Sequence, residues 1–195
     1  MKMVIFEKWF INSDKHGEQV IKRADKLLKY VDVSGNKSYL EVGCGTGKVA
    51  AYVAEKYPWN VTAVDIDPEQ IKQAQENSRS LKNIRFLAAD AMNLPFAESE
   101  FDIVLSFGTT HHISNWLAAL GDIRRVLKPE GYFIYYDLVY PAFFARLGRS
   151  FKHSYGIVTM PELKTFMKTH NLSEVHSSTK NSIVWYDYEL VCKNA

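Results

Sequence analysis

Glycines occupy alternate positions in one short stretch of the chain, Tyr39–Ala50 (YLEVGCGTGKVA). Gly43, Gly45 and Gly47 follow an apolar segment typical of a buried strand and precede the start of a helix. Glycine lets the backbone adopt positive φ and lets a ligand approach without meeting a Cβ. The helix presents unpaired N–H groups and the positive end of its dipole to that ligand. The stretch therefore favours a bound carboxylate or phosphate, although several nucleotide-binding folds use such a turn.

An aspartate follows the next predicted strand at an informative distance. Asp65 ends a β-branched run 22 positions after Gly43. Dinucleotide-binding folds hold a ribose-binding acid at about this spacing. A carboxylate accepts hydrogen bonds from both hydroxyls of a free ribose, so the spacing favours an adenosine-containing ligand without choosing between NAD and another. The alternative is that Asp65 only caps the helix that follows it.

Short apolar strands and helices alternate around these residues. Strands are predicted at 39–42, 61–65, 83–89, 101–106 and 131–137, with helices between them. The alternation predicts an α/β fold, a doubly wound and mostly parallel sheet with both faces covered. Ligands of such sheets bind beyond the carboxyl ends of the strands. Gly43, Asp65, Asp90 and Ser106 all lie at those ends.

The two ends of the chain depart from the alternation. Residues 1–36 contain an amphipathic helix preceded by an aromatic cluster (Phe6, Trp9, Phe10). This region is either a cap packed on the core or a lid or lipid-facing patch. Near the other end, segments 172–176 and 181–192 predict two strands joined by a polar loop at 177–180. That pair suggests an antiparallel strand at the edge of the sheet.

Length and composition indicate an ordinary globular domain. The 195 residues predict one domain, divided into an N-terminal cap or lid (1–36), a ligand-binding core (37–137) and a substrate-side segment with the terminal strands (138–195). A net charge of +2 gives no electrostatic case for nucleic acid. We recognise no membrane-spanning stretch or secretion signal. Cys44 and Cys192 lack metal or redox spacing, so we expect no metal and a cytoplasmic location.

Five segments in register resemble the class I S-adenosylmethionine-dependent methyltransferases that act on small molecules. They are LEVGCGTG (40–47), VTAVDIDPEQI (61–71), AADAMNLPF (88–96), FDIVLSFGTTHHI (101–113) and VLKPEGYF (126–133). The spacing G-x-G-x-G matches this family and departs from the dinucleotide pattern. The resemblance implies a Rossmann-like sheet of seven strands, the last of them antiparallel.

The resemblance also implies which residues would bind S-adenosylmethionine. The methionine part would meet Glu41, Gly43, Gly45 and Ser106, and the adenosine part would meet Asp65, Ile66, Asp90, Ala91 and Met92. Glu41 would hold the amino group directly or through water. Asp65 would accept from the ribose hydroxyls, Asp90 would accept from the adenine amino group, and Ile66 would pack on the ring. The competing interpretations are capping for Glu41 and core packing for Met92.

A methyltransferase must align a nucleophile with a methyl group that is already electrophilic, and must exclude water. A hydroxyl, an acidic carbon or a protonated amine also needs a base. The candidate bases are His111 and His112, for which packing or loop anchoring is the alternative. Further candidates are Tyr135, Tyr136, Asp137 and His153. The product of the reaction would be S-adenosylhomocysteine.

The expected acceptor is a small molecule, with room for an amphiphilic one. Base-amino methyltransferases carry Asn-Pro-Pro-Tyr or Asp-Pro-Pro-Tyr after the fourth strand, where this chain has Ser106-Phe107-Gly108-Thr109. Aromatic and basic residues near both ends, such as Phe143 and Phe144, leave room for a lipid headgroup or a quinone precursor and allow transient membrane contact. The alternatives are a non-catalytic cofactor-binding module that acts through a protein partner and, from the glycine turn and Asp65 alone, an NAD-dependent oxidoreductase.

Overall fold

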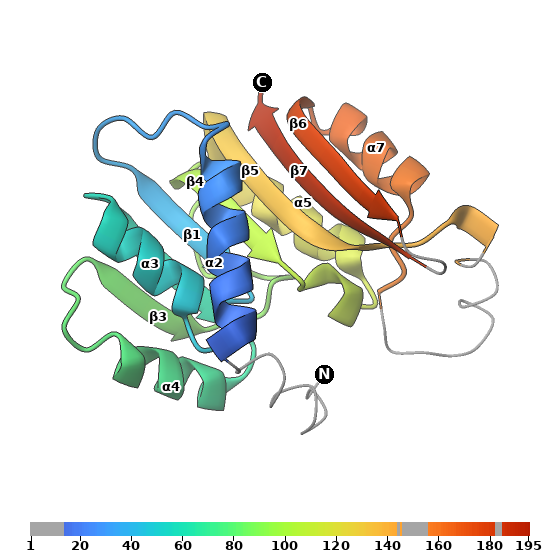
Figure 1. The fold of residues 1–195 in the computed structure, drawn as a ribbon. Helices are drawn as coiled ribbons and strands as arrows, with labels where there is room; N and C mark the ends of the chain where they lie inside the picture. The colour runs from blue at the N-terminus through green and yellow to red at the C-terminus, as the bar shows by residue number, and fades with distance from the viewer. Residues whose placement is uncertain (1–13, 144, 146–155, 182–184) are drawn as a thin grey trace.

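The computed structural model describes residues 14–143, 145, 156–181 and 185–195. Their centre is a seven-stranded sheet in the order β3-β2-β1-β4-β5-β7-β6 (Figure 1). The strands are β1 (Ser38–Val42), β2 (Asn60–Asp65), β3 (Ile84–Ala88), β4 (Phe101–Phe107), β5 (Leu127–Val139), β6 (Leu172–Asn181) and β7 (Tyr186–Asn194). The helices are α2 (Asp14–Leu28), α3 (Lys48–Lys56), α4 (Pro68–Asn77), α5 (Trp116–Val126) and α7 (Met160–Thr169), with a 3-10 turn η1 (Thr110–His112).

Strand direction confirms the predicted fold class. The pairs β3-β2, β2-β1, β1-β4 and β4-β5 are parallel, and the last strand, β7, is antiparallel to both β5 and β6. The expectation of an antiparallel strand at the edge is confirmed, because the edge strand β6 pairs antiparallel with β7, which itself lies between β5 and β6. The polar loop expected at 177–180 is wrong. Those residues belong to β6, whose place at the edge leaves most of its side chains in solvent.

The helices cover the two faces of the sheet in two groups (Figure 1). One core cluster contains Leu27 of α2, Val53 of α3 and Ile71 of α4. The other contains Leu120 of α5 and Leu163 of α7. Because neighbouring residues of a strand point to opposite faces, each central strand contributes to both clusters. The apolar runs of the central strands therefore fit a sheet that is buried on both sides.

Successive crossover connections run to opposite sides of β1, and this leaves a crevice at its carboxyl end. From β1 the chain crosses through α3 to β2 and through α4 to β3, all on one side. It then returns to place β4 on the other side of β1. Neighbouring connections therefore diverge beyond the end of β1, where doubly wound sheets bind ligands. The N–H groups of Gly43 and Cys44 both donate to the carbonyl of Val64 (2.8 and 2.9 Å), which joins the ends of β1 and β2.

Two predicted helix starts are confirmed by their caps. The side chain of Asp67 accepts from the N–H of Glu69 (3.0 Å) at the start of α4. The hydroxyl of Thr159 accepts from the N–H of Glu162 (3.4 Å) at the start of α7 and donates to the Glu162 carboxylate (2.6 Å), which is the N-cap half of the predicted capping box. These local signals fix where each helix begins, because they satisfy backbone N–H groups that have no partner within the helix.

The N-terminal helix α2 is fastened to the sheet by charged groups. Arg23 and Lys26 bind the two carboxylate oxygens of Glu189 on β7, at 2.9 and 2.6 Å. The hydroxyl of Tyr52 on α3 donates to Asp25 (2.7 Å). None of the described helices is long and apolar enough to cross a membrane. The aromatic cluster Phe6, Trp9 and Phe10, together with Phe144 and His153, lies outside the described residues.

Two glycines of the helical layers should respond oppositely to alanine. A Cβ at Gly121, inside α5, meets no atom within 4 Å. Gly47, before α3, has a φ of +77°, and its Cβ would lie 2.7 Å from the Phe86 ring. We expect Gly121→Ala to raise the free energy of unfolding by about 0.5–1 kcal/mol, because alanine has the higher helix propensity. Gly47→Ala should lower it by more than about 1 kcal/mol. Urea unfolding followed by circular dichroism tests both, and a destabilised Gly121→Ala protein would contradict the open environment of that residue.

Candidate functional site

A cavity of about 670 Å³ lies at the carboxyl ends of β1, β2 and β4. Its volume is in the range of pockets for small molecules. Its walls come from α2, from the ends of β1, β2, β4 and β5, and from the turns that follow β3 and β4. The lining residues are His16, Val20, Val42, Gly43, Gly45, Val64–Asp67, Ala89–Met92, Phe107–Thr109, His111–Ser114 and Tyr136–Leu138.

Most of the sequence-predicted site residues meet in this cavity. Those that line it are Gly43, Gly45, Asp65, Ile66, Asp90, Ala91, Met92, His111 and His112. Glu41 and Ser106 are not among the lining residues, and both are buried. Ser106 shares a strand face with Val104, which packs in the core beside α5, so its hydroxyl points to that core. If Ser106 contacts the methionine part as predicted, it must therefore do so through its backbone atoms.

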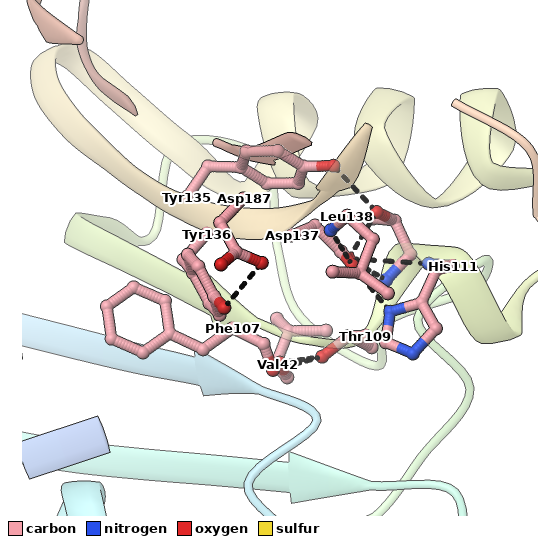
Figure 2. Close-up of polar contacts among 10 residues, drawn as sticks. Val42, Phe107, Thr109, His111, Tyr135, Tyr136, Asp137, Leu138 and Asp187 are labelled. Carbon is pink, nitrogen blue, oxygen red and sulfur yellow. Dashed lines mark hydrogen bonds and ion pairs between the residues drawn. The ribbon is translucent and has the colours of Figure 1, made fainter. Parts of the chain in front are cut away.

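The turn after β1 depends on glycine at position 43, which has no side chain. Gly43 has a φ of +80°, and a Cβ there would lie 2.1 Å from the Thr109 hydroxyl oxygen. That hydroxyl is 3.1 Å from the carbonyls of both Val42 and Phe107, at the ends of β1 and β4. Figure 2 shows Thr109 beside Val42 in this junction. Glycine at 43 therefore lets the turn after β4 close against the turn after β1.

Asp65 organises the neighbouring turn with both carboxylate oxygens. Oδ2 accepts from the N–H of Gly45 and Oδ1 accepts from the N–H of Asp67, each at 2.9 Å. The helix cap predicted as the alternative for Asp65 belongs to Asp67. Burial raises the pKa of Asp65 from its ordinary value. The N–H of Ile66 also donates to this carboxylate. Two carboxylate oxygens offer about four acceptor positions, so about one remains for a hydroxyl group of a ligand.

Exposed apolar side chains border the same part of the cavity. Ile66 is 54% exposed and Met92 is 40% exposed, although both are large and apolar. Large apolar residues at the rim of a pocket provide surface for a flat, weakly polar ring. The carboxylate of Asp90 accepts from the N–H of Met92 (2.9 Å), which fixes the turn and leaves a second carboxylate oxygen. This end of the site therefore offers apolar contact beside a hydrogen-bond acceptor.

A histidine and a buried aspartate meet at the other wall (Figure 2). Nδ1 of His111 lies 2.5 Å from Oδ1 of Asp137, whose side chain is fully buried. Thr110 donates to Oδ2 of Asp137 from its N–H (2.7 Å) and from its hydroxyl (2.6 Å). The hydroxyl of Tyr135 in turn donates to the Thr110 oxygen (2.8 Å), and the N–H of Leu138 donates to Oδ1 (2.7 Å). The 3-10 turn is thus built around this carboxylate.

The protonation of this pair follows from its surroundings. Burial acts to raise the pKa of Asp137, but the hydrogen bonds and charge of His111 and the hydrogen bonds from Thr110 and Leu138 hold it below its ordinary value. The carboxylate is therefore ionised at neutral pH and accepts a hydrogen bond from the N–H at Nδ1 of His111. In the neutral imidazole the lone pair then lies on Nε2, as a general base requires. His112 stacks obliquely on His111, with ring centres 3.9 Å apart.

An aromatic wall lies on the face of the sheet that α2 covers. Tyr136 and Phe107 line the cavity, and the planes of their rings lie at 83° to each other. Figure 2 shows both rings apart from the ring of His111. The guanidinium of Arg23 sits 3.5 Å from the centre of the Tyr136 ring. The Tyr136 hydroxyl donates to Asp187 (3.3 Å), and burial raises the pKa of Tyr136 to about 12. Tyr136 is thus a fixed, neutral wall.

Glu41 is a buried carboxyl group below the glycine turn. It is 4% exposed. The N–H of Ala50 donates to the carboxyl group, and Oε2 has no hydrogen-bond partner among the described residues. Burial raises the pKa of Glu41 to about 8, and the negative charge of Asp65 adds to the rise. Glu41 is therefore mainly neutral at pH 7, in contrast to Asp137.

Sequence reasoning missed several lining residues. His16 and Val20 come from α2, and Thr109 comes from the turn after β4. Thr110 does not line the cavity, but it binds the carboxylate of Asp137, which does. The spacing of four puts His16 on the same helix face as Val20, which packs against the core. This helical spacing could have predicted that His16 faces the protein interior. No comparable signal exists for Thr109 or Thr110, because their partners are 67 and 27 positions away.

Comparison with known proteins identifies the class of the chain. Residues 40–135 match the methyltransferase domain family. A probable phthiotriol/phenolphthiotriol dimycocerosates methyltransferase 2 of Mycobacterium ulcerans is 39% identical over 108 residues, which are 55% of this chain and 41% of that protein. A fatty-acid O-methyltransferase of Mycolicibacterium smegmatis is 33% identical over 126 residues, 64% of this chain and 45% of that protein. The chain thus spans less than half the length of these curated relatives.

A solved structure agrees with the sequence matches. Geranyl diphosphate methyltransferase in complex with S-adenosylmethionine superimposes with a TM-score of 0.75, covering 94% of this chain and 92% of the other at 12% identity. At that identity the likeness shows the fold alone. The family match and the curated relatives show that residues 40–135 form a methyltransferase domain, and the sheet order agrees with a Rossmann-like fold. This confirms the resemblance found in the sequence.

The buried Glu41 should make stability depend on pH. Its folded-state pKa of about 8 exceeds the ordinary 4.5, so the folded state holds this proton more tightly. Stability is then lost as the pH rises from about 5 to about 8. Relative to the wild type, Glu41→Gln should gain on the order of 4 kcal/mol in unfolding free energy across that interval. Urea titrations at several pH values measure this difference. Parallel curves for the two proteins would contradict the neutral carboxyl.

Proposed function

We propose that the chain is an S-adenosylmethionine-dependent methyltransferase whose acceptor is a lipid-like small molecule. The observation that carries this proposal is the cavity itself. It joins the predicted cofactor residues Asp65 and Asp90 on one wall to the His111–Asp137 pair on another. A methyl donor and an acceptor would therefore meet in one space.

The residues present fit the adenosine part of the cofactor. Asp65 lines the cavity and retains an acceptor position for a ribose hydroxyl after binding backbone N–H groups of its own turn. Ile66 and Met92 provide exposed apolar surface for the adenine ring, and Asp90 provides an acceptor for its amino group. Ala91 lines the cavity beside them. The methionine part would follow the turn at Gly43 and Gly45 towards Glu41.

The remaining chemistry would come from the opposite wall. Bound S-adenosylmethionine supplies an electrophilic methyl group. His111 would remove the proton of an acceptor hydroxyl through Nε2, since Nδ1 is held by Asp137. Asp137 would fix the ring and stabilise the imidazolium that results. Tyr136 and Phe107 would exclude water and contact apolar parts of the acceptor.

The relatives support the choice of acceptor class. One is named for fatty-acid O-methylation and another for phthiotriol dimycocerosates. Both names describe lipid-like acceptors, which agrees with the apolar wall of this cavity. We extend the proposal to the predicted division of the chain, in which residues 1–36 cover the site, 37–137 bind the cofactor and 138–195 meet the substrate. The cytoplasmic location and transient membrane contact remain predictions.

Removing the acids of the adenosine wall should weaken cofactor binding. We expect Asp65→Ala and Asp90→Ala each to raise the dissociation constant of S-adenosylhomocysteine at least about tenfold, because each variant loses hydrogen bonds worth about 1.4 kcal/mol or more. Titration calorimetry measures this. Asp32→Ala is the control, since Asp32 is exposed and outside the cavity. A wild-type protein that does not bind S-adenosylhomocysteine would overturn the proposed function.

The pairing of His111 with Asp137 predicts that loss of His111 slows methylation of some acceptors more than others. A hydroxyl must lose a proton during transfer, whereas a fatty-acid carboxylate is already ionised at pH 7. We expect His111→Ala to lower methylation of a long-chain alcohol by about 100-fold or more, but to change methylation of a long-chain fatty acid far less. Asp137→Asn should act in the same direction.

Transfer of labelled methyl from S-adenosylmethionine to each lipid measures this difference, with His112→Ala as the matched control. S-Adenosylhomocysteine affinity should stay within about threefold in all variants, because these side chains are placed on the acceptor wall. Equal losses on both acceptors would contradict the role of a general base. Cofactor binding without turnover of any lipid in an extract would favour the non-catalytic module.

A further inference from the structure

One arginine of α2 lies on the aromatic wall of the cavity. The guanidinium carbon of Arg23 is 3.5 Å from the centre of the Tyr136 ring, and Tyr136 lines the cavity. Resting on the proposed function, we propose that Arg23 is a specificity-determining residue. By covering this face of the ring, it directs the site towards acceptors with an uncharged head group and against acceptors with an ammonium head group.

The position of Arg23 follows from the face that α2 turns to the cavity. His16 and Val20 line the cavity, and Arg23 follows them at the spacing i, i+4, i+7, which keeps the three side chains on one face of the helix. Figure 1 shows this helix lying across the sheet. The stripe that borders the cavity therefore continues into a cation that lies over the aromatic wall.

Arg23 is fixed by a second contact on the sheet. Its Nε donates to Oε1 of Glu189 (2.9 Å), and its side chain is only 25% exposed. Glu189 on β7 stands directly opposite Tyr136 on β5 in the antiparallel ladder, so their side chains share one face of the sheet. The planar guanidinium can therefore stack on the ring while its N–H group binds the neighbouring carboxylate.

The Tyr136 ring is held in the same arrangement. Its hydroxyl donates to Asp187 (3.3 Å; Figure 2), and Phe107 packs against it with ring centres 5.9 Å apart. An aromatic face attracts a cation through the negative potential above the ring. Arg23 already occupies that position, and both carboxylate oxygens of Glu189 bind cations of α2. An ammonium head group would therefore find neither an open ring face nor an available carboxylate here.

An uncharged acceptor loses nothing by this arrangement. A long-chain alcohol needs apolar contact, which Val20 and Phe107 would supply, and a base for its proton, for which His111 is placed. An ammonium group at the same place would instead lie near the guanidinium, and like charges repel each other. The selection thus comes from an obstacle to the wrong head group, which is one of the two ways in which binding sites discriminate.

Binding of two probes with equal chain length tests the proposal. Titration calorimetry with octanol and with octyltrimethylammonium, a permanent cation, gives the ratio of their dissociation constants in the full chain saturated with S-adenosylhomocysteine. We expect the wild type to bind octanol more tightly. Arg23→Gln should shift the ratio at least about tenfold towards the ammonium probe, because the ring face and Oε1 of Glu189 become available.

Lys26→Gln is the matched control for this experiment. Lys26 binds the other oxygen of Glu189 (2.6 Å), so the variant also removes a cation from that carboxylate but leaves Arg23 on the ring. We expect it to shift the ratio by less than about threefold, because only the covered ring face separates the two variants. An equal shift in both variants would assign the effect to Glu189 and overturn the role of Arg23.

The remaining outcomes separate this inference from the proposed function. Failure of the wild type to bind S-adenosylhomocysteine overturns the proposed function and this inference with it. With S-adenosylhomocysteine bound, an unchanged ratio in Arg23→Gln, tighter wild-type binding of the ammonium probe, or no binding of either probe overturns only the role of Arg23.

A second variant covers the case in which Arg23→Gln does not fold. Tyr136→Leu should then weaken both probes by the same factor, within about threefold, because a ring covered by Arg23 gives the ammonium group no additional contact. The same calorimetric titrations measure this. A selective loss of ammonium binding in Tyr136→Leu would show that the ring face is open to cations and would overturn the inference.

Discussion

The close approach of two turns at the carboxyl end of β1 is the constraint on which the site depends. Gly43 has a positive φ and no side chain, and the Thr109 hydroxyl occupies the space where a Cβ would stand. That hydroxyl reaches the carbonyls that end β1 and β4. The turns after β1 and β2 and the histidine turn after β4 are therefore parts of one packed unit.

Two buried acids near this junction show how environment divides the chemistry. Asp137 is surrounded by donors, and its pKa lies below the ordinary value despite burial. Glu41 has a backbone donor and a neighbouring anion, and burial raises its pKa to about 8. The first can stabilise a positive charge on His111, whereas the second is mainly neutral at pH 7 and lies below the glycine turn, outside the cavity lining. Two buried acidic groups thus differ in charge because their partners differ.

Prediction from sequence succeeded where local signals are strong and failed where neighbours in space decide. Asp67 and Thr159 cap helices as expected, because capping is a local hydrogen-bond problem. The segment 177–180 belongs to β6 although it is polar, because pairing with β7 supplies its backbone hydrogen bonds and the edge position leaves its side chains in water. The place of β7 between β5 and β6 is likewise decided by strand pairing.

The sequence by itself determined the α/β class, the glycine turn, the acids at 65 and 90 and the methyltransferase family, because strand and helix periodicity and short motifs are local properties. Only the tertiary structure decided that His111 pairs with Asp137, that Thr109 fills the space above Gly43, and that Glu41 and Ser106 are buried away from the cavity. These contacts join residues that are far apart in the chain or select one of two faces of a strand. Strand order and helix packing fix such choices, and no local pattern encodes them.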